Sequence, residues 1–114
     1  MWSPIGAGDG RPSHHTFTTD SGAFPLTGLS GSNIALHMED IYNNNQLYIC
    51  TGTWTITGTG SSTVPGKADF TPSVADLSTG YLGVPGLYKV YPVVTLSTGP
   101  TPMDSQVLQV VSLP

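Results

Sequence analysis

The sequence predicts an all-β fold, an immunoglobulin-like antiparallel β-sandwich of about seven strands that follows an extended N-terminal arm. Short stretches of alternating apolar and polar residues are separated by turn residues, among them 14 Gly and 10 Pro. Residues 67–95 read as strand, short corner, Pro-Gly turn and long strand, which is how a Greek key crosses between sheets. With 114 residues, one domain is expected, with the arm over residues 1–13 and the sandwich over residues 14–114.

Alternation defines the individual strands and the side chains that face the core. We expect Ile34, Leu36 and Met38 on one face of a strand, and Trp54 and Ile56 inward on another. Residues 97–102 read as a loop stiffened by proline. The strands are expected over residues 14–19, 33–39, 46–51, 53–57, 67–71, 87–96 and 105–113. The predicted core contains Leu36, Trp54, Ile56, Phe70, Tyr88 and Val90.

The corner in residues 72–86 has its own local signals. Pro72 ends the preceding strand because proline cannot donate to a sheet ladder. Ser73 is placed to cap a single helical turn over residues 73–77. Pro85 and Gly86 stand where a type II turn requires them, ahead of the longest strand-like run and its hairpin partner at the end of the chain.

The charge balance excludes several classes of partner. The net charge is −4, and the only cations are Arg11, Lys67 and Lys89, too few for a face that binds nucleic acid or an anionic membrane. No apolar run approaches the ~20 residues of a transmembrane helix. Residues 1–4 lack the basic start and apolar segment of a secretory signal. A chain with one cysteine must hold together by packing alone, which suits synthesis in a reducing cytoplasm.

The reactive side chains do not form a recognisable catalytic or metal-binding arrangement. Cys50 is the only cysteine, so an intramolecular disulfide is impossible and we expect a buried packing residue. His14 and His15 are adjacent on a strand and point to opposite faces, so they cannot easily share a metal ion. His37 and Glu39 lie about 7 Å apart on one strand face, too far for the direct contact that an acid/base pair needs. We therefore expect no cofactor, no metal and no enzymatic activity.

The arm carries the candidate partner-binding residues Trp2, Pro4, Ile5 and Arg11. A tryptophan on a Gly- and Pro-rich segment has two uses. It folds back onto its own domain, or it anchors in a partner, where tryptophan is over-represented among hot spots. The second alternative implies that removal of residues 1–13 leaves the domain folded.

Several short motifs occur in a familiar order between residues 17 and 111. An Asp-Ser-Gly turn at residues 20–22 precedes Leu-Thr-Gly at residues 26–28. Later, Ala-Asp-Leu at residues 75–77 precedes Pro-Gly-Leu-Tyr-Lys-Val at residues 85–90. This order resembles the N-terminal domain of tailed-phage baseplate upper proteins and related small virion proteins.

The resemblance implies a non-enzymatic structural protein of a tailed-phage virion, in the capsid, neck or baseplate. Its partners would be other virion subunits, including further copies of itself, reached through the arm and a sheet surface. The alternative is a carbohydrate- or cell-surface-binding module that uses exposed tyrosines, for which Tyr42, Tyr48, Tyr81 and Tyr91 are the candidates.

Overall fold

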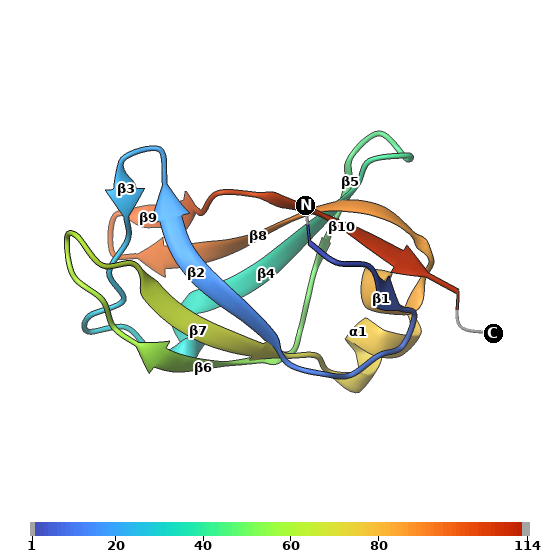
Figure 1. The fold of residues 1–114 in the computed structure, drawn as a ribbon, viewed down its shortest axis with the longest axis horizontal. Helices are drawn as coiled ribbons and strands as arrows, with labels where there is room; N and C mark the ends of the chain where they lie inside the picture. Colours follow the sequence, from blue (N-terminus) through green and yellow to red (C-terminus); the bar gives the residue numbers. More distant parts are fainter. Residues whose placement is uncertain (1, 113–114) are drawn as a thin grey trace.

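Two β-sheets pack face to face in a body of 43 × 25 × 24 Å (Figure 1). The computed structural model describes residues 2–112. Met1, the first residue of the expected arm, lies outside that range, as do Leu113, the last residue of the expected final strand, and Pro114. The larger sheet has the order β1 (Ile5–Gly6), β10 (Gln106–Val111), β8 (Gly86–Leu96), β4 (Ile34–Asp40) and β5 (Gln46–Ile49), with β9 (Gly99–Pro102) also paired to β8. The smaller sheet has the order β3 (Gly22–Ala23), β2 (Ser13–Thr19), β7 (Gly66–Thr71) and β6 (Thr53–Gly58).

The strand order is that of an immunoglobulin-like sandwich, as predicted. The β10-β8-β4-β5 and β2-β7-β6 orders correspond to the GFCC′ and BED sheets of the variable-type fold. Tyr88, near the start of β8, donates its hydroxyl to the carbonyl of Val84 at 2.7 Å, as the tyrosine corner of that fold does. One pair departs from the antiparallel prediction, because β1 runs parallel to β10.

The core follows the predicted alternation. Five of the six expected core side chains are buried, and Ile56 is half-buried against the same cluster. Cys50 is buried, as expected for a packing residue, and burial raises the pKa of its thiol. Phe17 and Leu26 are fully buried although neither was among the expected core residues.

The long strand β8 organises the larger sheet. It pairs with β4 along one edge, and β10 and β9 lie end to end along the other. The prediction of a loop over residues 97–102 is therefore wrong, because Gly99–Pro102 form β9. Strand alternation directs the missing N–H groups of Pro100 and Pro102 away from β8, so an edge strand tolerates both prolines.

The corner between β7 and β8 is helical, and one expected turn is absent. Ser73 caps α1 (Val74–Ser78), as predicted, by accepting from the N–H of Asp76 at 3.1 Å. The 3-10 helix η2 (Tyr81–Gly83) follows, and another of the same length, η1 (Gly31–Asn33), precedes β4. Gly86 lacks the positive φ of a type II turn and instead begins β8. A Cβ there would lie 2.9 Å from the Tyr88 hydroxyl, so the glycine makes room for that ring.

None of the helices within residues 2–112 is long and apolar enough to cross a membrane.

Candidate partner-binding site

The N-terminal arm is docked on its own sandwich. The N–H of Trp2 donates to the carbonyl of Val107 at 3.0 Å, and Ile5 lies opposite Val110 in the parallel β1–β10 pair. Trp2 and Ile5 are half-buried against the core cluster. Of the two alternatives for Trp2, the structure therefore shows the one in which the side chain folds back onto its own domain.

An aromatic chain connects the arm to the centre of the core. The rings of Trp2 and His15 pack edge to face with their centroids 5.1 Å apart, and the centroids of the His15 and Trp54 rings are 4.9 Å apart. Trp54 then contacts Phe70 at 5.1 Å. Burial disfavours the imidazolium and lowers the pKa of His15 to about 4, so this ring is neutral at neutral pH.

A cavity of about 500 Å³ lies beneath the arm. Its floor is aliphatic and comes from both the sandwich interior and η2, and its rim is polar. Three of the four predicted partner-binding residues, Trp2, Ile5 and Arg11, line it, whereas Pro4 is exposed and does not. The floor is formed by Leu36, Leu82, Val90 and Leu108.

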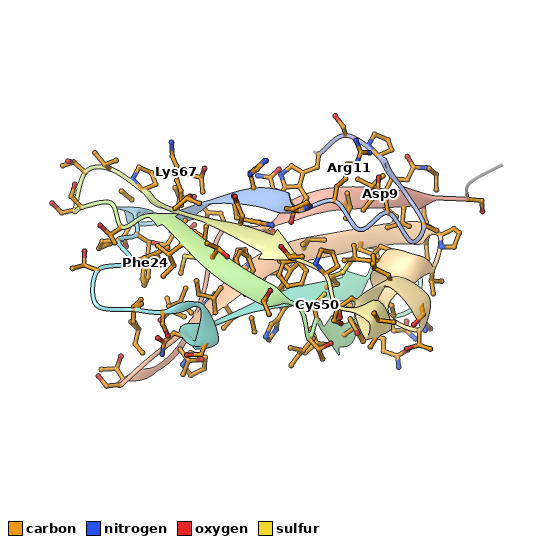
Figure 2. All side chains as sticks on the ribbon, turned by 90° about the horizontal axis from the view of Figure 1, so that it is seen from below. Asp9, Arg11, Phe24, Cys50 and Lys67 are labelled. Carbon is orange, nitrogen blue, oxygen red and sulfur yellow. The ribbon has the colours of Figure 1, made fainter. Side chains whose placement is uncertain are left out.

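Asp9 and Arg11 form an ion pair at the rim of this cavity (Figure 2). The guanidinium donates to both carboxylate oxygens, with its shortest contact at 2.6 Å. These hydrogen bonds from Arg11 hold the pKa of Asp9 below its ordinary value. Arg11 is 82% exposed, but its charge is already matched, so it offers little attraction to a distant partner.

The β5 edge patch, defined as Ile41, Tyr42, Leu47 and Ile49, was not predicted from the sequence. Leu47 and Ile49 are each 48% exposed, and they lie opposite Glu39 and His37 on the outer face of the larger sheet. Ile41 is 37% exposed and Tyr42 is 79% exposed. The only local signal is that residues 46–49 carry no charge, although an edge strand commonly carries one.

The described strand edges differ in their protection against further pairing. On the opposite side of the larger sheet, β9 carries Pro100 and Pro102, and β1 has two residues. On the smaller sheet, β6 shows threonines to solvent. By contrast, β5 combines an open edge with exposed apolar side chains and has neither lysine nor proline. Such an edge is a template for a strand from another chain.

Three of the four tyrosines proposed as a sugar platform are engaged within the protein. Tyr48 hydrogen bonds to Asp76, and Tyr81 stacks on Tyr88 at 4.8 Å. Tyr91 donates to Glu39 at 2.5 Å, and burial together with Glu39 raises its pKa to about 12. The four tyrosines therefore form no common exposed platform.

The histidines take the directions that strand alternation predicts. His15 points into the core, whereas His14 is exposed and lies 2.7 Å from Asp69. His37 lies on the outer face, 5.5 Å from the ring of Tyr91. Within residues 2–112, no three His, Cys, Asp or Glu side chains are grouped so as to hold a metal ion.

No protein-family model matches the chain, and neither the curated proteins nor the solved structures include a significant match to it.

Proposed function

We propose that this protein is a non-enzymatic structural component of a tailed-phage virion. It attaches to a neighbouring capsid, neck or baseplate subunit when a strand of that subunit pairs with the free edge of β5. The motif order described above supports the virion context. The single observation that carries the mode of attachment is the β5 edge patch, where an unprotected edge strand shows two half-exposed aliphatic side chains.

Strand addition suits the chemistry of this surface. A strand laid along β5 would satisfy its outward main-chain groups, and main-chain hydrogen bonds supply affinity in this mode. Leu47 and Ile49 would then give specificity through apolar contacts on the outer face. The low charge of the chain, 9% against about 25% on average, is compatible with such close packing.

The arm plays a secondary part in this proposal. Because Trp2 and Ile5 pack on their own domain, the segment offers a neighbour chiefly the exposed Pro4 and Arg11. The proposed partners are other virion subunits and further copies of this chain, assembled after synthesis in the host cytoplasm.

A pair of lysine substitutions tests the attachment surface. Leu47→Lys with Ile49→Lys protects β5 in the way that natural edge strands are protected, and both sites are half-exposed, so the fold should persist. The matched control is Thr53→Lys with Thr55→Lys on β6, the edge strand of the smaller sheet. We expect the first pair to be lost from particles made with the variant in place of the parent, and the control to be incorporated.

Mass spectrometry of purified particles measures the incorporation, and thermal melting checks that each variant is folded. Full incorporation of a folded variant with both β5 lysines would refute attachment at this edge. Sedimentation velocity of the isolated protein identifies the neighbour: self-association that the β5 lysines remove indicates a second copy, and a monomer indicates a different subunit.

A further inference from the structure

We propose that a second hollow, separate from the β5 edge patch, binds a neutral saccharide. This cleft has a volume of about 720 Å³ and lies between the β2–β3 hairpin, the outer face of β8 and the segment that joins β9 to β10. The side chains that would contact a sugar are Asp20, Ser21, Lys89, Tyr91, Thr101 and Asp104.

The charges in the cleft select the ligand class. Lys89 contributes one positive charge and Asp20 and Asp104 contribute two negative ones, so an anionic ligand such as a phosphate or a sialic acid is repelled. A sugar hydroxyl both donates and accepts, and it therefore suits a site that offers an ammonium donor beside carboxylate acceptors. The hydroxyls of Ser21 and Thr101 extend this capacity along the cleft.

Two of the polar groups are held in place before any ligand arrives. The carboxylate of Asp104 accepts from the Thr18 hydroxyl at 2.7 Å, and the Asp104 N–H donates to the Thr18 carbonyl at 2.8 Å. The ammonium of Lys89 lies 5.6 Å from the centre of the Tyr91 ring. Tyr91 in turn is fixed by its hydrogen bond to Glu39. Pre-organised groups bind more tightly because less freedom is lost on binding.

The cleft also provides apolar surface for the C–H face of a sugar ring. The half-buried ring of Tyr91 borders the hollow, together with Phe24, Pro102 and Met103. This combination of a few polar groups and an aromatic wall is the usual make-up of a small-molecule site.

The cleft and the proposed attachment surface lie on different edges of the larger sheet. The strands β9 and β10 border β8 on one side, whereas β4 and β5 lie on the other. Phe24, which lines the cleft, lies toward the opposite end of the molecule from the Asp9–Arg11 pair, so the cleft is also separate from the cavity beneath the arm (Figure 2). Saccharide binding and attachment through β5 are therefore open to separate tests.

An array of immobilised neutral hexasaccharides of glucose, galactose, mannose, xylose and N-acetylglucosamine, probed with the full chain, tests the proposal. We expect binding to at least one of them, weakened about tenfold or more by Lys89→Ala and by Asp20→Ala, since each removes a charged hydrogen-bond partner. Both side chains are exposed, so neither variant should unfold.

Lys67→Ala is the matched control, because Lys67 is exposed on β7 of the other sheet (Figure 2) and should leave binding unchanged. The variant with lysines at positions 47 and 49 should also bind the sugar fully, whatever its incorporation into particles. Absence of binding to every neutral sugar would overturn the proposal. So would binding that Lys89→Ala and Asp20→Ala leave unchanged, or a preference for anionic glycans.

Discussion

The hydroxyl of Tyr48 donates a 2.7 Å hydrogen bond to Asp76, and this bond holds the edge strand β5 to the helix that follows β7 of the other sheet. The same carboxylate accepts from the N–H groups of Thr51 at 2.8 Å, Gly52 at 2.9 Å and Ser73 at 3.0 Å. Asp76 is fully buried. One carboxylate therefore joins α1 to the passage from β5 to β6, where the chain changes sheets.

Asp76→Asn should destabilise the fold by about 3 kcal/mol, because a neutral amide replaces an acceptor of several charge-assisted hydrogen bonds and turns an NH2 group toward N–H donors. Chemical denaturation measures the change. Asp20→Asn, at an exposed site, is the control and should have little effect. Equal unfolding free energies for the two variants would contradict the role assigned to Asp76.

Protonation of His15 should weaken the fold as the pH falls from about 6.5 toward 4. Burial lowers its pKa to about 4 in the folded protein, although the charge of Asp69 acts in the opposite direction and that of His14 adds to the lowering. The unfolded chain thus binds the proton first, and stability present above pH 6.5 is lost on acidification. A shift of this size corresponds to a loss of about 3 kcal/mol.

Denaturant titrations between pH 7 and pH 4 measure this slope, and His15→Phe should reduce it. At lower pH a further loss is expected from Asp76. Burial opposes its ionisation, but hydrogen bonds from Ser73, Thr51, Tyr48 and Gly52 outweigh burial and lower its pKa.

Trp54→Ala should cost roughly 3–5 kcal/mol, the usual effect of removing a large buried aromatic side chain. Trp54→Phe should cost clearly less, because it retains a ring between His15 and Phe70. It also removes the indole N–H, which is the one buried side-chain polar atom without a hydrogen-bond partner among the described residues. Thermal melts that rank the two variants in the reverse order would disprove this account.

Trp2→Ala should lower the free energy of unfolding by about 2 kcal/mol, roughly half the cost of removing a fully buried tryptophan side chain. The reason is that the Trp2 ring is half-buried and covers His15. It should also raise the pKa of His15, which a proton NMR titration of the imidazole measures. An unchanged His15 pKa together with an unchanged melting temperature would place the Trp2 ring in solvent. The docked arm further implies that removal of residues 1–13 lowers the melting temperature of the domain.

Local patterns predicted the elements that depend on neighbouring residues. Alternation placed Leu36 and Trp54 in the core, and the capping role of Ser73 is confirmed because a cap is decided within four residues. The parallel β1–β10 pair was not predicted, since two residues carry no periodic signal and the partner strand begins about 100 positions later. The β9 strand was missed because its prolines favour a loop unless the strand lies at an edge.

The candidate site was predictable only in part. The sequence singled out Trp2, Ile5 and Arg11, which the fold gathers around one cavity. It did not reveal that Leu47 and Ile49 are half-exposed, because the alternation of a strand shows which residues share a face but not whether the strand lies at the edge of its sheet.

The prolines on the side of the larger sheet away from β5 determine how far an assembly can grow. Pro4 lies beside β1, and Pro100 and Pro102 lie in β9, and proline has no N–H to donate to a further strand. That side therefore cannot pair with a full strand, and the larger sheet of each molecule can add a strand at one edge, β5. Two copies that meet through β5 close into a pair with no free end, whereas an open head-to-tail arrangement would continue into a fibre. A subunit of this kind terminates a sheet rather than propagating it.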